Sequence, residues 1–353
     1  MTEPSTMRAW RTHEYGEPRT ALRLDDVEIP EPEAGEVRVR ALGIPLNLND
    51  LERVTGGNMM VRPDLPYSPG MEVMGIVDTC GAGAEALAGK RVVAITRQAY
   101  GGFAEYSICP AVSAFEMPEE IPLPDAAALF FPFHLAWLGL FDRADLQAGE
   151  TVLVHAAAGG AGSAAIQLAV DKGAHVIATV GSDEKMQLCR DLGAETVVGY
   201  DDFAQVVLEQ TDNRGVDVVF DNVGEAVMAD SMNALAYNGR YLMMGFASDK
   251  TVADEKSIVP RRIAMGNFKL CGVLLSYADD ERQKMMKGLL GWNLPSDALG
   301  AEITRNIVEM VTTKRIRPVV GNVVEFEDVP AALEAMGNRE TVGRTVVRLW
   351  DGA

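Results

Sequence analysis

Residues 151–172 combine a strand, a glycine-rich turn and a helix without a break, and this feature limits the fold more than any other. The strand is "TVLVHA" (151–156), the turn contains Gly159, Gly160 and Gly162, and the helix follows in "SAAIQLAVDK". A run so rich in alanine and glycine is compatible with a flexible spacer, a buried helix of small residues or a phosphate-binding turn. Its position directly between a strand and a helix excludes the spacer.

A dinucleotide site needs this arrangement, because the chain must turn tightly and let a pyrophosphate approach the backbone. The helix N-terminus then offers free N–H groups and a partial positive charge to the phosphates. The usual G-x-G-x-x-G becomes A-x-G-G-x-G here, so the motif by itself leaves the packed-helix alternative open. The residues predicted to contact the pyrophosphate are Ala157, Gly159, Gly160, Ala161 and Gly162.

The rest of the chain predicts an α/β protein with two different halves. Strand-like runs at 151–156, 175–180, 196–200, 216–223 and 240–246 alternate with helical stretches at 162–172, 183–192, 202–210 and 225–236. This rhythm is typical of a doubly wound parallel sheet. The first third instead has short β-type runs at 36–44, 72–80, 91–96 and 103–109, which favour a curled antiparallel barrel or a small mixed sheet.

Between and after these halves, three segments carry further predictions. The apolar stretch 125–144 predicts a helix with a kink or break at Pro132. An amphipathic helix is expected at 301–314, followed by short strands that rejoin the first half. Residues 247–260 have the composition of a loop.

Composition narrows the functional classes. A chain of 353 residues favours two domains, and a formal net charge of −19 argues against nucleic acid and anionic membranes as partners. Four scattered cysteines suggest neither a disulfide framework nor a zinc knuckle. The N-terminus does not read as a signal peptide, and no apolar run reaches the ~18–20 residues of a membrane span. We therefore expect a cytoplasmic protein.

Several segments in order resemble the quinone oxidoreductase branch of the medium-chain dehydrogenase/reductase superfamily. They are "GEVRVRALGIPLNLNDLERVTG", "LPYSPGMEVMGIV", "VHAAAGGAGSAAIQLA", "VDVVFDNVG", "YLMMGFAS" and "TVGRTVVRL". The resemblance implies a GroES-like, barrel-type substrate domain (1–128 and 275–353) and an inserted Rossmann domain (129–274). It also implies a homodimer and a small, hydrophobic, electron-poor substrate.

The cofactor is predicted to be NADP(H). The second strand of the parallel sheet ends in Gly181 and Ser182 instead of an acidic residue, which leaves room for a 2′-phosphate that Ser182 and Lys185 can contact. Ser182 capping the next helix, with Lys185 solvated, is the alternative. The resemblance adds Tyr200 at the same phosphate. The remaining cofactor contacts that it implies are Asn222, Val223, Phe246, Ala247 and Arg344.

Zinc is not expected. In the zinc-dependent members a cysteine and a histidine ligate the metal where this sequence has Asn47 and Met71, and an amide with a thioether is a poor zinc set. The resemblance makes Asn47 and Asp50 candidate lining residues of the substrate and nicotinamide site, with a structural cap as the alternative for Asp50. His134 is either an acid or a packed side chain.

The predicted activity is hydride transfer from NADPH to a quinone or an α,β-unsaturated carbonyl. The alternatives are a zinc-free alcohol dehydrogenase, an enoyl-thioester reductase and an NADPH-binding protein without activity. A basic pocket mouth would favour the thioester, and Arg261 with Arg262 is the one obvious basic pair.

Overall fold

The computed structural model describes residues 5–57, 62–244 and 260–350, and its chain forms two compact units. The first unit comprises Met1–Phe130, Ser276–Thr312 and Val319–Ala353, and the second comprises Phe131–Leu275 and Thr313–Pro318. Phe246, Ala247 and nearly all of the predicted loop 247–260 lie outside the described residues. Among the described residues, no helix is long and apolar enough to span a membrane.

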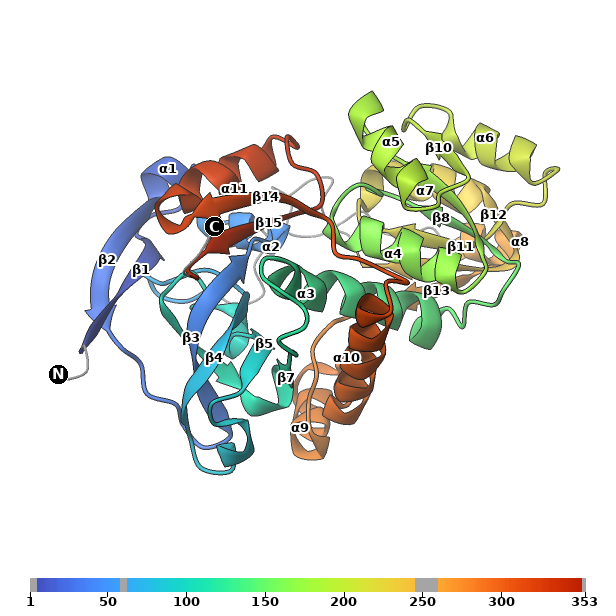
Figure 1. Ribbon diagram of the computed structural model, residues 1–353. Helices are drawn as coiled ribbons and strands as arrows, with labels where there is room; N and C mark the ends of the chain where they lie inside the picture. The colour runs from blue at the N-terminus through green and yellow to red at the C-terminus, as the bar shows by residue number, and fades with distance from the viewer. Residues whose placement is uncertain (1–4, 58–61, 245–259, 351–353) are drawn as a thin grey trace. The chain divides into compact units, whose positions relative to one another are not determined.

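The first unit is built on mainly antiparallel strands. A seven-stranded sheet has the order β14-β15-β3-β4-β5-β7 with β6 on β3, and β1 and β2 form a separate hairpin. The C-terminal strand β15 pairs with β3, so the last strands of the chain rejoin the sheet of the first half, as predicted (Figure 1). The strands are β1 (Thr6–Thr12), β2 (Leu22–Glu28), β3 (Glu36–Pro45), β4 (Glu72–Cys80), β5 (Arg91–Ile95), β6 (Tyr106–Pro110), β7 (Ala114–Glu116), β14 (Val320–Glu325) and β15 (Arg344–Arg348).

The helices of the first unit are short except near its return from the second unit. They are α1 (Pro18–Ala21), α2 (Leu48–Thr55), α9 (Asp280–Leu290), α10 (Asp297–Thr312) and α11 (Val329–Gly337). The helix predicted at 301–314 corresponds to α10 and begins four residues earlier. Valines of β3, β4 and β5 pack against α2 and α11 in one apolar core.

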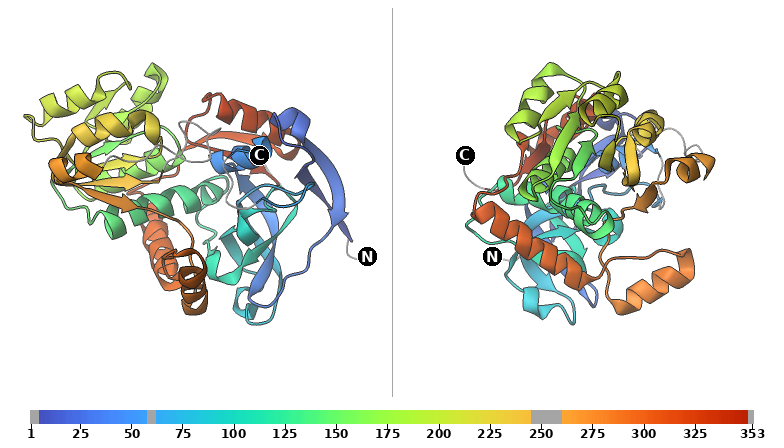
Figure 2. Two further views of the ribbon diagram at one scale, coloured as in Figure 1. Left: turned by 180° about the vertical axis from the view of Figure 1, so that it is seen from behind. Right: turned by 90° about the vertical axis from the view of Figure 1, so that its right-hand side faces the viewer.

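The second unit has the predicted doubly wound sheet, which is parallel with the order β10-β9-β8-β11-β12-β13. Its helices cover both faces: α4 stands before the sheet in Figure 1, and yellow helices cover the opposite face in the rear view of Figure 2. The elements are β8 (Thr151–Val154), α4 (Gly160–Asp171), β9 (His175–Thr179), α5 (Asp183–Asp191), β10 (Thr196–Val198), α6 (Phe203–Gln210), β11 (Val216–Asp221), α7 (Glu225–Asn233), β12 (Leu235–Met243), α8 (Pro260–Gly266) and β13 (Lys269–Gly272).

Of the kink or break predicted at Pro132, the break is wrong. Helix α3 (Asp125–Trp137) runs through the proline and continues as a π-helical turn, Leu138–Arg143. Proline removes one backbone donor from a helix. Most side chains of this segment are buried, and Phe130 and Phe133 are each at most 2% exposed, so tertiary packing outweighs the local penalty.

Residues 313–318 return to the second unit, whereas the resemblance implied that all of 275–353 belongs to the first. The Gln167 side chain of α4 binds both backbone groups of Arg317, each at 2.9 Å. Arg315 also pairs with Asp171 at the end of α4. These contacts anchor the segment to α4.

Candidate cofactor-binding site

The turn between β8 and α4 brings the predicted phosphate-binding residues together. Ala156 lies in the left-handed region (φ +49°), and its carbonyl accepts the Gly159 N–H at 3.0 Å. Gly159 is the N-cap of α4, and the first helical turn contains no acidic side chain. Gly160 and Ala161 are half-buried. The N-terminus of α4 therefore offers N–H groups without a competing carboxylate, as an anion site requires.

Gly162 shows why this turn needs glycine. A Cβ at Gly162 would lie 2.4 Å from the Ala156 carbonyl oxygen and 2.6 Å from the Ala157 Cα. Both neighbours are backbone atoms, which cannot move aside as a flexible side chain can. The close approach of helix and turn forms a cradle that any side chain at residue 162 would fill.

The loop after the neighbouring strand β11 is held by Asp221, which is 1% exposed. One carboxylate oxygen accepts the N–H groups of Val223 (2.7 Å) and Gly224 (3.0 Å), and the other accepts the Tyr241 hydroxyl. Burial raises the pKa of Asp221 against these hydrogen bonds. Asp221 thus orders the loop that carries the predicted contacts Asn222 and Val223.

Asn222 provides a direct test of whether a ligand fits here. Its side-chain nitrogen Nδ2 is buried and has no hydrogen-bond partner. A buried donor without a partner costs about 1–3 kcal/mol. A ligand acceptor at this loop would remove that cost, so the residues present fit a bound cofactor.

Of the three residues predicted to contact the 2′-phosphate, Tyr200 already has a protein hydrogen-bond partner. Gly181 and Ser182 are exposed at the end of β9, and Lys185 is half-buried in the first turn of α5. Ser182 occupies the N-cap position, but its side chain makes no capping hydrogen bond. The Tyr200 hydroxyl accepts the Ala156 N–H at 3.0 Å, so this side chain supports the phosphate turn itself.

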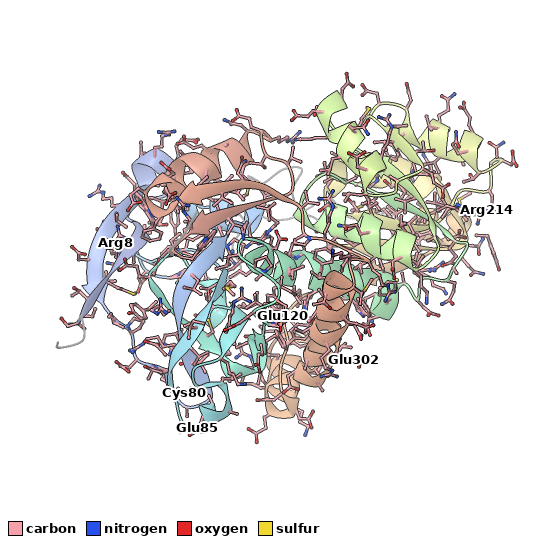
Figure 3. The ribbon with its side chains drawn as sticks, viewed as in Figure 1. Arg8, Cys80, Glu85, Glu120, Arg214 and Glu302 are labelled. Atoms are coloured by element: carbon pink, nitrogen blue, oxygen red, sulfur yellow. The ribbon has the colours of Figure 1, made fainter. Side chains whose placement is uncertain are left out.

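Charged pairs of the second unit lie at the edge of its sheet where the parallel strands begin. Arg214, labelled in Figure 3, precedes β11 and pairs with Asp217 at 2.6 Å. Arg240 pairs with Glu150, which precedes β8, at 2.6 Å. The carboxyl edge, where the turns of β8 and β11 lie, is instead organised by buried hydrogen bonds.

In the first unit, Asn47, Asp50 and Arg344 belong to one buried network. The Asn47 amide oxygen accepts from Arg344 Nη1 at 2.8 Å, and Arg344 Nη2 pairs with Glu72 at 2.6 Å. Asp50 accepts the N–H groups of Asn47 (2.9 Å) and Met71 (3.0 Å). Asp50 is therefore the N3 residue of a capping box whose N-cap is Asn47, which agrees with the structural alternative. Arg344, predicted at the cofactor, has its two terminal nitrogens bound to first-unit partners.

Asp50 is fully buried, and desolvation raises the pKa of its carboxyl to about 6 in spite of the Arg53 guanidinium 3.6 Å away. Burial also lowers the pKa of His134, 2% exposed, to about 3, which favours the packed alternative over an acid. Within the described residues, no cluster of three His, Cys, Asp or Glu side chains is arranged to hold a metal ion.

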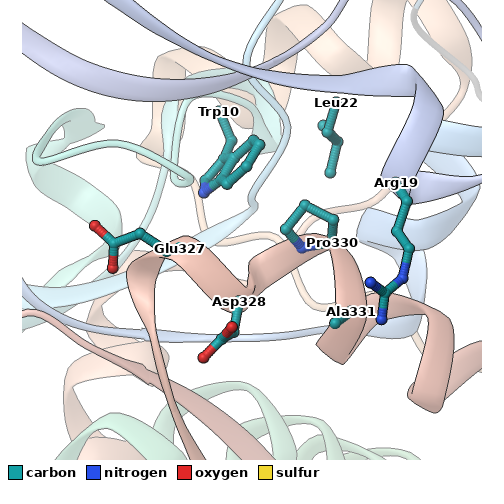
Figure 4. Close-up of a pocket in the computed structure, with 7 residues that line it drawn as sticks. All are labelled: Trp10, Arg19, Leu22, Glu327, Asp328, Pro330 and Ala331. Carbon is teal, nitrogen blue, oxygen red and sulfur yellow. The ribbon is translucent and has the colours of Figure 1, made fainter.

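A shallow pocket on the first unit lies at α1 and α11. It has a volume of about 290 Å³ and is lined by Trp10, Leu22 and Pro330 with the charged side chains Arg19, Glu327 and Asp328 (Figure 4). The Trp10 indole nitrogen donates to the Phe326 carbonyl at 2.7 Å, and Arg8 pairs with Glu327 at 2.7 Å. Its main polar groups already have protein partners.

Sequence reasoning missed the supporting residues His155, Glu72 and Tyr241. Each is a polar side chain on a strand or directly after one, with partners distant in sequence: His155 binds Thr179 and Ser231, which lie 24 and 76 residues away. An isolated polar residue in an apolar strand gives no sign of such partners. The predicted basic pair is also partly engaged, since Arg262 binds Asn233 at 2.5 Å.

Comparison with known proteins agrees with this architecture. A family profile described as "Alcohol dehydrogenase GroES-like domain" matches residues 33–119, and one described as "Zinc-binding dehydrogenase" matches residues 160–290. The quinone oxidoreductase of Rattus norvegicus is 30% identical over 313 residues, which cover 85% of this chain and 91% of the rat protein.

Solved structures give the same result. The quinone oxidoreductase of Thermus thermophilus, solved also as its complex with NADPH, is 32% identical over 97% of this chain and 100% of that chain (TM-score 0.78). An NAD-dependent alcohol dehydrogenase is 26% identical over 97% of this chain and 100% of that chain (TM-score 0.81). The resemblance seen in the sequence is confirmed: the chain belongs to the quinone oxidoreductase-like branch of the medium-chain dehydrogenase/reductase superfamily.

Proposed function

We propose that this protein is a zinc-independent, NADPH-dependent reductase of quinones or α,β-unsaturated carbonyl compounds. The observation that carries the proposal is the cradle between Ala156 and Gly162, together with the buried Asn222 Nδ2 that lacks a partner. The Thermus thermophilus relative of the same family was solved with NADPH. When bound, NADPH supplies a hydride, and the protein supplies binding and orientation.

The residues proposed to hold the cofactor divide into two groups. Backbone groups of Ala157, Gly159, Gly160, Ala161 and Gly162 receive the pyrophosphate, and Asn222 with Val223 contacts the nicotinamide half. Ser182, Lys185 and Tyr200 select the 2′-phosphate, because Gly181 and Ser182 follow β9 and the first acidic residue, Asp183, begins α5. Phe246, Ala247 and Arg344 stay predicted contacts, and Asn47 and Asp50 stay predicted lining residues.

Zinc independence rests on the chemistry of the donor set. The Asn47 amide oxygen already accepts from Arg344, and Met71 offers a thioether that is 6% exposed. Zinc prefers thiolate, imidazole and carboxylate ligands. We expect less than stoichiometric zinc in the purified protein, and stoichiometric zinc by elemental analysis would contradict the proposal.

The central experiment measures NADPH consumption at 340 nm against a panel of quinones and enones. We expect turnover with members of this panel and a larger thermal stabilisation by NADPH than by NADH. Binding of NADPH without turnover of any acceptor would favour the binding-protein alternative. Equal stabilisation by the two cofactors, with oxidation of alcohols, would favour the alcohol dehydrogenase. The predicted homodimer and cytoplasmic location are further proposals, the first of which sedimentation tests.

A further inference from the structure

His155 is buried at the carboxyl end of β8, directly before the phosphate turn. It is 0% exposed, and its backbone N–H donates to the Phe220 carbonyl of β11 at 3.0 Å. Its ring has two partners from other elements. Nδ1 lies 2.8 Å from the Thr179 hydroxyl at the end of β9, and Nε2 lies 2.7 Å from the Ser231 hydroxyl of α7.

The hydroxyl groups fix the tautomer of the ring. Ser231 donates its hydroxyl hydrogen to the Val227 carbonyl at 2.7 Å, so its oxygen accepts from Nε2–H of His155. Nδ1 then carries a lone pair and accepts the Thr179 hydroxyl. Burial lowers the pKa of His155 to about 3, which agrees with a neutral ring at physiological pH.

Two aromatic side chains complete the surroundings. The Tyr200 ring stacks on the imidazole with centroids 6.3 Å apart and an interplanar angle of 21°, and Phe203 meets it edge-on at 4.9 Å. The Tyr200 hydroxyl accepts the N–H of Ala156, the residue after His155. The imidazole directly follows β8, and it contacts the last residue of β9, two aromatic residues after β10 and a serine within α7.

We propose that His155 is a positioning residue for the cofactor: its ring ties the end of β8 to the end of β9, to the connection after β10 and to helix α7, and so holds the left-handed turn at Ala156. The inference rests on the proposed function. It deepens that function, because it assigns a role to a side chain that does not reach the cofactor.

Tight packing explains how a change at the His155 ring affects the phosphate turn. The Ala156 carbonyl lies so close to Gly162 that a Cβ there would be 2.4 Å away. A small displacement of Ala156 is therefore passed directly to the first turn of α4. Left-handed backbone is unfavourable for alanine, so the turn depends on its surroundings to persist.

Three variants remove the two hydrogen bonds of the ring, singly or together. Thr179→Val deletes the donor to Nδ1, Ser231→Ala deletes the acceptor of Nε2–H, and His155→Phe deletes both while keeping a ring beside Tyr200. We expect each of the first two to raise the Kd and KM for NADPH about tenfold. The kcat at saturating NADPH should stay within twofold of the wild type.

His155→Phe should raise the Kd for NADPH no more than the double variant Thr179→Val/Ser231→Ala does, because all of these changes act through the same ring. His155→Gln, whose amide nitrogen can replace Nε2–H toward Ser231, should recover part of the affinity. The matched control is Thr304→Val in the first unit, a buried threonine that donates to the Gly300 carbonyl at 2.9 Å. It should lower the Tm without changing the Kd for NADPH.

The outcomes separate this inference from the proposed function. If the wild type fails to bind NADPH in a fluorescence titration, the proposed function is overturned together with the inference. If the wild type binds and Thr179→Val and Ser231→Ala bind equally well, the inference alone is overturned. Nitrogen NMR of the His155 ring gives an independent readout: a proton on Nε2 between pH 6 and 8 supports the positioning role, and a proton on Nδ1 overturns it.

Discussion

At the scale of single residues, the second unit keeps its functional edge in order with buried polar side chains. His155 and Asp221 lie at the ends of adjacent strands, and each fixes the backbone of the turn that follows it. Buried polar groups are tolerated only when they are hydrogen-bonded, so each demands a defined set of partners. This requirement makes the two turns specific in shape.

The Gly162→Ala substitution tests the closeness of helix and turn. Its Cβ would meet two backbone atoms within 2.6 Å, so we expect a loss of about 1–3 kcal/mol of unfolding free energy and at least tenfold weaker NADPH binding. Urea denaturation and a fluorescence titration measure the two effects. Gly288→Ala in helix α9 is the control, because a Cβ there meets no atom within 4 Å. A Gly162→Ala protein as stable as this control would contradict the packing argument.

Asp50 predicts a pH dependence of stability. Its pKa of about 6 in the folded protein exceeds the unfolded value near ~3.9, so the folded state binds the proton more tightly. The stabilisation is complete below about pH 4 and is lost as the pH rises through about 6, by ~3 kcal/mol in total.

The comparison with Asp50→Asn isolates this contribution. The difference in unfolding free energy between the wild type and Asp50→Asn should fall between pH 4 and pH 6, because the amide does not titrate. Asp201→Asn, at an exposed position, is the matched control and should show no such change. A constant difference across this pH range would contradict the raised pKa of the buried Asp50 carboxyl.

At the scale of elements, the loop after β11 depends on the neighbouring strand. Tyr241 of β12 donates to the same carboxylate that orders Val223 and Gly224. Tyr241→Phe should cost about 1–2 kcal/mol of unfolding free energy and weaken NADPH binding, because Asp221 loses a buried donor. Tyr237→Phe, at a position that is 76% exposed, is the control. Thermal unfolding with and without NADPH distinguishes them, and equal behaviour of the two variants would argue against a role for Asp221.

The sequence predicted elements well where burial leaves a periodic pattern. The runs at 36–44, 72–80 and 91–96 correspond to β3, β4 and β5, whose side chains are largely buried. Helix α9 was missed because it has no buried residue, so its sequence shows no apolar stripe. Strand β2 was missed for a similar reason: most of "LRLDDVE" faces solvent. The turn 156–162 was predicted because its chemistry is local, whereas the partners of His155 come from the tertiary fold.

At the scale of the whole molecule, the net charge of −19 opposes the approach of an anionic cofactor. Raising the ionic strength from 0.01 to 0.15 M shortens the Debye length from about 30 to about 8 Å and screens this repulsion. We expect the association rate of NADPH to increase several-fold over that range in stopped-flow fluorescence. A rate that falls with added salt would mean that nearby cations such as Lys185 outweigh the global field. The Lys185→Gln variant would test that explanation, because it removes one of these cations.

The attachment of residues 313–318 to α4 has a consequence for biosynthesis. Gln167 is 7% exposed, and its amide binds both backbone groups of Arg317, which leaves the ribosome 150 residues later. Until then, water must take the place of those two backbone groups. A chain released after residue 275 would contain all six strands of the parallel sheet and still lack this anchor. One continuous stretch of chain therefore supplies the whole parallel sheet of the inserted unit. The unit nevertheless reaches its final form only after residue 318 has been made.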